Sequence, residues 1–441
     1  MAATNQEREL LERLFRAAVA DVEPARLVRS RLFRDDEGEA RLRAGTRRVL
    51  ALTGRRLWMI AAGKAAPAMA SAAAQILGPR LAGGMVAAPR RPSDLPRVLR
   101  AFCAGHPLPD RGSLAAGRAA WTLLGRVRVD DCVLVLLSGG ASSLLVLPAA
   151  GLLLRDKIRT NDLLLRASAA IAEVNAVRKH LSRLKGGGLA RRAGGARLVC
   201  LILSDVIGSS PAVVGSGPTA ADPTTYADAL RILERRGLLD RVPPRVRRHL
   251  ELGRAGRRPE TMKPGERRTE NHVIGDNRRA LAAAAAAARA AGLECDILTA
   301  SMRGDTGRSA RAFAAEIRRR GRRARRPLCL LAGGETTVEV RGRGRGGRNQ
   351  QFALVLADAI RGLPDVHCLS AGSDGRDGPT DAAGAFADGT TADRAARLGL
   401  GLHAFLERND SYRFFDRLGD LFRPGPTGTN VMDLKFALIK S

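Results

Sequence analysis

Lysine chemistry is confined to few positions in this chain, because only seven of its 74 basic residues are lysine. Three of the seven, Lys64, Lys179 and Lys185, lie in Gly-rich or polar segments. If a compositional bias turned replaceable lysines into arginine, the remaining lysines should be enriched where an ammonium group is needed. These three are therefore the first candidates for contacts to an anionic substrate.

Glycine-containing turns follow two of the apolar runs that we expect to be strands. Residues 57–61 lead into Gly63 and Lys64, and residues 131–137 lead into a turn with two glycines and three hydroxyl groups. Such turns before a helix present backbone N–H groups to phosphate or carboxylate oxygens. The alternatives are a surface lysine at a helix start and a plain turn. The candidates in the second turn are Ser138, Gly139, Gly140 and Ser142.

A third cluster of polar candidates lies between residues 171 and 190. Helical spacing places Asn175 and Lys179 on one face, with Arg178 beside it. Lys185 follows with a run of glycines, of which we take Gly186 and Gly187 as candidates for binding the substrate or nucleotide. The alternative is a basic, solvated helix face.

Four carboxylates in predicted loops are candidate Mg²⁺ ligands. Asp205 follows the predicted strand 198–203, and Glu335 follows the predicted strand 328–332. Asp374 and Asp377 lie in an acidic loop after a further strand. Mg²⁺ is commonly held by one or two carboxylates together with water or phosphate. The alternatives are a helix N-cap at Asp205 and Asx turns in the acidic loop.

A glycine-rich loop at residues 342–347 matches the dinucleotide fingerprint GxGxxG literally. Arginines interrupt it, and no strand ends in an acidic residue about 20 positions further on. Arginine on a glycine loop favours a polyphosphate or a carboxylate, and the alternative is an exposed basic loop. The candidates here are Gly346, Gly347, Arg348 and Asn349.

The elements that position these loops alternate between apolar strands and helices, which predicts an α/β fold with a parallel sheet covered on both faces. The pattern predicts a long helix over 161–184 and separate strands at 328–332 and 336–340. We expect an N-terminal domain over 1–255, a connection over 256–270, and a C-terminal α/β region over 271–441.

Composition excludes several functional classes. A formal charge of +30 is compatible with nucleic-acid binding, but arginine is spread along the chain and only 3% of residues are aromatic. The six scattered cysteines form no CxxC pair and read as reduced core residues. The N-terminus has no apolar signal region, and charges interrupt the apolar stretches. We therefore expect a cytoplasmic protein without a membrane-spanning segment, and the composition favours functions other than nucleic-acid binding.

Taken together, the segments resemble one family, the glycerate 2-kinases with a C-terminal MOFRL domain, whose members are also labelled hydroxypyruvate reductases. The resemblance runs through most of the chain in family order, and long strings such as EVNAVRKHLS and GPTGTNV are specific. The matching stretches are AAGKAAPAMA (61–70), GHPLPD (105–110), LSGGASSLL (137–145), IAEVNAVRKHLSRLKGGGLA (171–190), LILSDVIG (201–208), GSGPT (215–219), GGETTV (333–338), GRGGRNQQFAL (344–354), LSAGSDGRDGPTDAAGA (369–385) and NDSYRFF…GPTGTNVMDL (409–434).

The resemblance implies a Rossmann-like N-terminal domain and a smaller C-terminal α/β domain, MOFRL, over about 325–437, with the active site in the cleft between domains. It implies ATP, a divalent cation such as Mg²⁺, and phosphorylation of glycerate at its 2-hydroxyl. The family's active-site lysine falls on Lys64 and its arginine on Arg348. We add Asp205 as a third catalytic candidate from its loop position. Ser209 and Gln351 depart from the family, which commonly has Asp and Glu there.

Two other classes of function stay open as alternatives. The fingerprint at 342–347 favours an NAD(P)-dependent hydroxypyruvate reductase. The excess of arginine favours an Arg-rich nucleic-acid-binding protein. The sequence leaves the oligomeric state open, with a homodimer as one alternative.

Overall fold

Two compact units make up the chain in the computed structural model, which describes residues 2–45, 48–92, 94–267 and 269–440. The central unit is Pro24–Ile274, and the terminal unit combines Met1–Glu23 with Gly275–Ser441. The first helix, which the sequence-based division assigned to the N-terminal domain, thus belongs by its contacts to the same unit as the C-terminal half of the chain.

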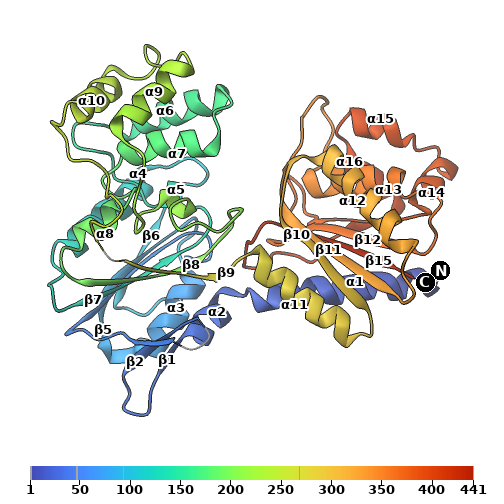
Figure 1. The fold of residues 1–441 in the computed structure, drawn as a ribbon, viewed down its shortest axis with the longest axis horizontal. Helices are drawn as coiled ribbons and strands as arrows, with labels where there is room; N and C mark the ends of the chain where they lie inside the picture. Colours follow the sequence, from blue (N-terminus) through green and yellow to red (C-terminus); the bar gives the residue numbers. More distant parts are fainter. Residues whose placement is uncertain (1, 46–47, 93, 268, 441) are drawn as a thin grey trace. The chain divides into compact units, whose positions relative to one another are not determined.

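A six-stranded sheet forms the core of the central unit (Figure 1). Its order is β6-β5-β4-β7-β8-β9, and the four pairs from β6 to β8 are parallel. The first strand of this sheet, β4, therefore lies between the second and the fourth, which is the doubly wound Rossmann order with its switch point between β4 and β7. The strands are β4 (Leu57–Ala62), β5 (Leu81–Ala88), β6 (Leu99–Cys103), β7 (Cys132–Leu137), β8 (Arg197–Leu203) and β9 (Glu270–Gly275).

Helices cover both faces of this sheet, as the apolar strands predict. All six residues of β7 are buried. Alternate residues such as Ile60 and Val135 pack in one core cluster with Ala116 and Leu124 of α4 (Arg111–Leu124). On the other face α3 (Ala66–Leu77) contacts β4, β5 and β7. The prediction of a parallel α/β sheet is confirmed.

A helical layer lies on the α4 side of the central unit and has its own apolar core (Figure 1). The predicted helix over 161–184 is wrong, because two helices are present, α6 (Leu154–Arg166) and α7 (Ile171–His180). Between them Ser168 has a left-handed φ of 50°, and Ala170 donates its N–H to Glu173 at 2.9 Å. No glycine or proline marks this break. The other helices of the layer are α9 (Tyr226–Arg235) and α10 (Pro244–Arg254).

Smaller elements complete the central unit. A three-stranded antiparallel sheet precedes β4 and pairs in the order β1-β2-β3. The elements are α2 (Pro24–Arg31), β1 (Leu32–Arg34), β2 (Ala40–Ala44), β3 (Arg48–Ala51), η1 (Gly78–Arg80), α5 (Ala141–Leu144), α8 (Gly188–Arg192) and η2 (Val214–Ser216).

The terminal unit contains a mixed six-stranded sheet in the order β10-β11-β15-β12-β13-β14. Only β10 and β11 pair in parallel among the described pairs, and β15 lies antiparallel between β11 and β12. The two predicted strands at 328–332 and 336–340 are one strand, because the ladder to β10 continues through a register shift. The strands are β10 (Glu294–Asp305), β11 (Leu328–Thr337), β12 (Val366–Gly372), β13 (Gly384–Asp388), β14 (Leu421–Phe422) and β15 (Asp433–Ile439).

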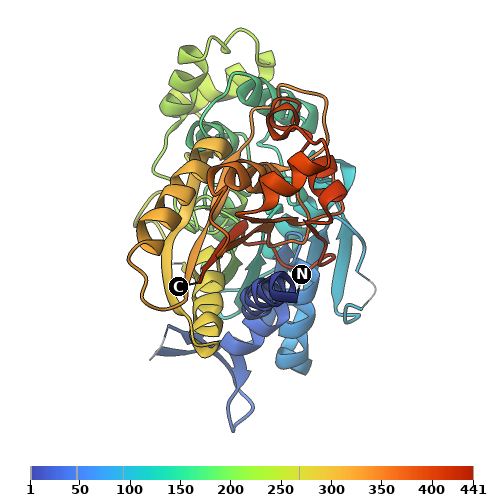
Figure 2. The same ribbon diagram turned by 90° about the vertical axis from the view of Figure 1, so that its right-hand side faces the viewer.

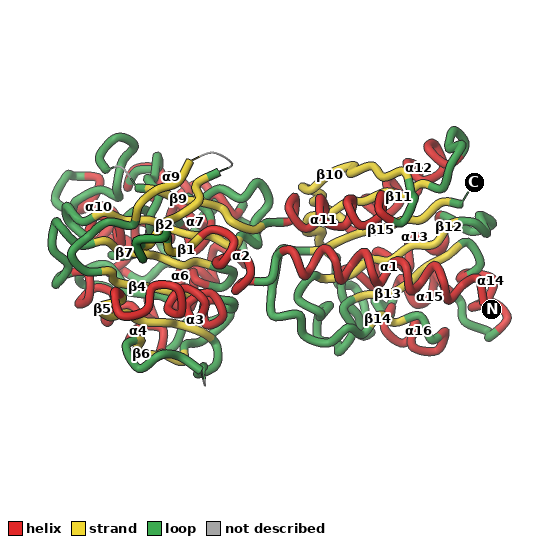
Figure 3. Tube along the Cα trace, turned by 90° about the horizontal axis from the view of Figure 1, so that it is seen from below, coloured by secondary structure: helices red, strands yellow, loops and turns green. Residues whose placement is uncertain are grey.

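Helices also cover both faces of this second sheet (Figure 2). On one face α1 and α11 run side by side along the strands (Figure 3), and Phe15 of α1 packs edge-on against Phe422 at 5.0 Å. No helix in the described part of the chain is long and apolar enough to cross a membrane. The helices are α1 (Ala2–Asp21), α11 (Asn277–Ala290), α12 (Thr306–Gly321), α13 (Arg348–Ala359), α14 (Thr391–Arg397), α15 (Leu402–Glu407) and α16 (Ser411–Leu418).

Candidate functional site

The two glycine turns predicted from the sequence interlock at the switch point of the central sheet. The N–H of Lys64 donates to the carbonyl of Gly139 at 2.8 Å, and the N–H of Ala65 donates to Ser138 Oγ at 3.1 Å. Gly63 has φ 136°, and a Cβ at this position would lie 2.1 Å from Ser138 Oγ. The turn therefore needs glycine, and it fixes the backbone of Lys64 while its side chain stays exposed.

Asp205 lies against the same turn. A Cβ added to Gly139 would stand 2.2 Å from Asp205 Oδ2, so this glycine lets the carboxylate approach. Burial raises the pKa of Asp205, and the nearby charge of Lys64 opposes that rise. The structure thus brings together Lys64, Asp205 and the Gly139 turn, which the sequence placed on three separate loops.

Beside the switch point, hydroxyl and amide groups converge on Ser142. Its Oγ lies 2.9 Å from Ser216 Oγ, and Ser216 donates to Asn175 Oδ1 at 3.0 Å. Arg178 Nη1 reaches Ser142 Oγ at 3.3 Å, and Lys185 Nζ donates to the Ser142 carbonyl at 2.8 Å. Four predicted residues, Ser142, Asn175, Arg178 and Lys185, therefore form one hydrogen-bonded layer. Ser216 was missed, although it stands in the matched string GSGPT, and it holds a left-handed φ of 64°.

Among the described residues no carboxylate pairs with the basic side chains in and beside this layer, Arg178, Lys185 and Lys157. Burial and the neighbouring charges of Lys157 and Arg178 hold the pKa of Lys185 well below its ordinary value. Burial, with Arg178, lowers the pKa of Lys157 to about 7. Among the described residues none of the three forms an ion pair. An anion bound here would supply the missing negative charge.

Lys179 and the glycines after Lys185 have partners inside the protein. Lys179 Nζ pairs with the buried Asp222 at 3.2 Å. The N–H groups of Gly186 and Gly187 donate to the carbonyls of Ser216 and Gly217, at 3.1 and 2.7 Å. Their backbone donors are therefore engaged in fixing the loop, which positions Lys185 beside Ser142.

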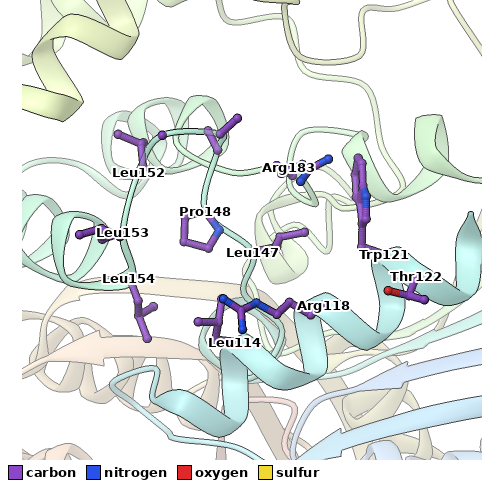
Figure 4. Close-up of a pocket in the computed structure, with 13 residues that line it drawn as sticks. Leu114, Arg118, Trp121, Thr122, Leu147, Pro148, Leu152, Leu153, Leu154 and Arg183 are labelled. Atoms are coloured by element: carbon purple, nitrogen blue, oxygen red, sulfur yellow. The ribbon is translucent and has the colours of Figure 1, made fainter.

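Two cavities lie in the helical part of the central unit. One, of about 660 Å³, is lined by Lys179, Lys185 and Gly186 together with several arginines. The other, of about 440 Å³, lies between α4 and the loop after Leu147 (Figure 4). Leucine side chains, Trp121 and Arg183 line this second cavity, and none of the predicted site residues does.

In the terminal unit Arg348 begins α13 and is held by two carboxylates. Its Nε and Nη2 donate to the two oxygens of Asp433 at 2.7 and 3.0 Å, and its Nη1 lies 2.7 Å from Glu335 Oε1. The planar fork is therefore fixed by a bidentate pair. Asp433 was missed, because it lies 85 positions along the chain from Arg348.

A buried network continues behind Arg348. Asp377 accepts the N–H groups of Asn349 and Gln350 at 3.0 and 2.8 Å, so it caps α13. The Asn349 side chain donates to Asp433 at 3.0 Å, and its Oδ1 accepts a bond from Lys435 Nζ. Burial raises the pKa of Asp377 to about 6. Asn349 and Asp377, both predicted, thus belong to the hydrogen-bond network that holds Arg348 in place.

The glycine loop at 342–347 packs against residues 408–410. The N–H of Gly344 donates to the Arg408 carbonyl at 2.8 Å, and those of Gly342 and Arg345 donate to Asn409 and Asp410. Backbone donors that a dinucleotide pyrophosphate would need are therefore already bonded. The strand after α13, β12, is separated from β11 by β15, whereas the fingerprint belongs to adjacent parallel strands.

The four predicted metal ligands lie in different settings. Asp205 is in the central unit and the other three are in the terminal unit. Glu335 pairs with Arg348, Asp377 caps a helix, and Asp374 accepts the N–H of Arg376 in a turn at 3.1 Å. The described residues contain no group of three or more His, Cys, Asp or Glu side chains that could hold a metal ion. Asp205 and Asp374 form no ion pair within the described residues, so their carboxylates stay available.

Comparison with known proteins identifies two family models in the chain. Residues 10–251 match a domain of unknown function, DUF4147, and residues 328–433 match the MOFRL family. The first match covers more than half of the sequence. A glycerate 2-kinase from Pyrococcus horikoshii is 40% identical over 88% of both chains. A D-glycerate 2-kinase from Thermotoga maritima is 39% identical over 87% of this chain and 91% of its own.

Further relatives carry two kinds of name. Human glycerate kinase is 36% identical over the whole of this chain and 94% of its own. A protein of Agrobacterium vitis, 39% identical over 98% of this chain, is named putative hydroxypyruvate reductase. Among solved structures, the glycerate kinase of Thermotoga maritima covers 99% of this chain with a TM-score of 0.87 and 36% identity. A protein of Pyrococcus horikoshii covers 98% with a TM-score of 0.85.

Proposed function

The chain belongs to the glycerate kinase family that joins a DUF4147 domain to a MOFRL domain, and we propose that it transfers the terminal phosphoryl group of ATP to the 2-hydroxyl of glycerate. The observation that carries the proposal is the switch point of the central sheet. There Lys64 is presented beside Asp205 on a turn that needs glycine at Gly63 and Gly139.

Phosphoryl transfer requires positioning and charge neutralisation more than covalent chemistry from the protein. Lys64 supplies an exposed ammonium group that neutralises the transferred phosphoryl group or the carboxylate of glycerate. Arg348 presents its guanidinium in a fixed plane, because Asp433 holds it bidentately. We expect the two groups to serve one reaction. If they do, the K64A/R348A double variant is hardly slower than either single variant.

The layer around Ser142 suits the phosphates of a nucleotide. Within the described residues Arg178 and Lys185 form no ion pair with a carboxylate, and both reach Ser142 Oγ, which in turn lies beside Ser216 Oγ. A polyphosphate contributes several negative charges and many acceptor oxygens, which is what this layer lacks. Binding there would leave the exposed ammonium of Lys64 for the reacting end.

Mg²⁺ fits only those predicted carboxylates that form no ion pair within the described residues. Asp205 forms no ion pair within the described residues, and a kinase site commonly holds Mg²⁺ through one or two carboxylates plus substrate phosphates. When bound, the ion would supply positive charge that neutralises the phosphate oxygens. Asp205 would otherwise orient the attacking hydroxyl, for which its raised pKa suits a proton acceptor.

The test is an ATP-dependent assay with D-glycerate, in which the product is identified as 2- or 3-phosphoglycerate by ³¹P NMR. We expect 2-phosphoglycerate and one ADP per turnover. The same preparation is given hydroxypyruvate and NADH or NADPH. Stoichiometric oxidation of the nicotinamide without ATP consumption would replace the kinase by the reductase.

A further inference from the structure

His106 lies at the switch point, although its own strand is at the edge of the sheet. It follows β6, and β5 and β4 separate that strand from β7. A Cβ added to Gly140, directly after β7, would nevertheless lie 2.9 Å from His106 Cδ2 and 3.1 Å from its Nε2. The loop after β6 therefore crosses the carboxyl edge of the sheet and brings an imidazole to the turn that contacts Lys64.

The loop holds the imidazole in place through its own hydrogen bonds. The N–H of Ala104 donates to Ala88 at 3.0 Å, and the N–H of Gly105 donates to Ser113 Oγ at 3.2 Å. At the other end Asp110 caps α4 by accepting the N–H of Ser113 at 2.8 Å. These bonds fix the backbone on both sides of His106.

The ring of His106 differs from the structural histidines of the same unit. His180 Nδ1 lies 2.7 Å from the Ala176 carbonyl, and His249 Nε2 lies 3.0 Å from the His180 carbonyl. Within the described residues neither ring nitrogen of His106 has a hydrogen-bond partner, and its side chain is exposed. His180 and His249 thus each use a ring nitrogen inside the protein, whereas both ring nitrogens of His106 are left for solvent or a ligand.

Partial burial of the ring lowers the pKa of His106, and the charge of Lys64 lowers it further, so both influences favour the neutral form of the imidazole. A neutral imidazole offers one N–H donor and one acceptor nitrogen. Those two groups complement a hydroxyl, which also donates and accepts, whereas the ammonium of Lys64 complements an anion.

We propose that His106 hydrogen-bonds a hydroxyl of the acceptor substrate and thereby determines which small hydroxy acid is bound beside Lys64. This inference rests on the proposed function, since it assumes a substrate that carries both a carboxylate and hydroxyl groups. His106 would contact the substrate hydroxyl, while Lys64 contacts the carboxylate or the phosphoryl group.

The test compares His106→Ala and His106→Asn with His403→Ala, which removes a histidine that is 77% exposed on α15. We expect His106→Ala to lower kcat/KM for D-glycerate about tenfold or more, mainly through KM, with KM for ATP unchanged. Asparagine keeps a donor and an acceptor, so His106→Asn should recover part of the loss. Equal melting temperatures would show that the fold is intact.

An NMR titration separates this inference from the proposed function. D-glycerate added to the wild type should shift the ¹⁵N resonances of the His106 imidazole, whether or not turnover occurs. An inactive wild type would refute the kinase. Unchanged resonances, or kcat/KM of His106→Ala equal to that of His403→Ala, would overturn the role of His106.

Discussion

Replacing Asp433 by asparagine should both destabilise the terminal unit and impair Arg348. Asp433 is fully buried and lies between two cations. It accepts two bonds from Arg348, and its Oδ2 is 3.6 Å from the Nζ of the buried Lys435. Burial raises the pKa of Asp433, but Lys435 and Arg348 outweigh it and hold the pKa below its ordinary value. The carboxylate is therefore ionised and balances both cations.

Removing one partner of a buried ion pair costs about 3–5 kcal/mol, because the remaining charge is left uncompensated. For a unit of this size that corresponds to a fall in melting temperature of roughly 6–20 °C. We expect Asp433→Asn to show such a fall by circular dichroism, and to lower kcat/KM at a temperature where it is still folded. The matched control is Asp393→Asn, which breaks the exposed pair with Arg361 and should be nearly neutral.

A double variant separates the effect of the unbalanced charge from poor packing of the new asparagine. Asp433→Asn combined with Lys435→Met removes both buried charges, so it should recover part of the lost stability. It should not restore kcat/KM, because Arg348 still lacks its bidentate partner. The charge argument would be refuted if Asp433→Asn and Asp393→Asn had the same melting temperature. It would also be refuted if the double variant were no more stable than Asp433→Asn alone.

The other predictions concern both units. Lys64→Ala should lower turnover about 10²–10³-fold with an unchanged melting temperature, since its side chain is exposed; near-normal turnover would remove it from the mechanism. Gly139→Ala should lower turnover about 10²-fold, because the new Cβ would stand 2.2 Å from Asp205 Oδ2; Gly401→Ala, where the nearest atom is 3.9 Å away, is its control. The pKa of Asp377 rises from 3.8 to about 6 on folding, so its contribution to stability should fall by about 3 kcal/mol as pH rises through that window. The free energies of unfolding of wild type and Asp377→Asn, measured with denaturant at a series of pH values, should change differently across this window. If they changed in parallel with pH, the raised pKa would be contradicted.

Local sequence was sufficient for three central strands of the first sheet and for the glycine turns after two of them. Apolar runs bounded by glycine predicted β4, β7 and β8 within one or two residues, because strands buried on both faces must be apolar throughout. Gly63 was a candidate because glycine permits a tight turn before a helix, and the structure requires glycine there because Ser138 approaches its backbone closely. The break at Ser168 had no such signal, since neither glycine nor proline marks it.

The partners of the candidate residues were decided only by the tertiary structure. Segment 433–439 carries Asp433 and Lys435 among apolar residues, and nothing in it predicts that β15 inserts between β11 and β12 and brings Asp433 to Arg348. Nor does the motif around His106 reveal that its loop crosses the sheet edge to Gly140. Burial on both faces leaves a continuous apolar run in the residues of the strand itself, and so the local sequence indicated which segments form strands. Strand order and side-chain contacts depend on residues that are far apart along the chain and that come together only when the protein folds.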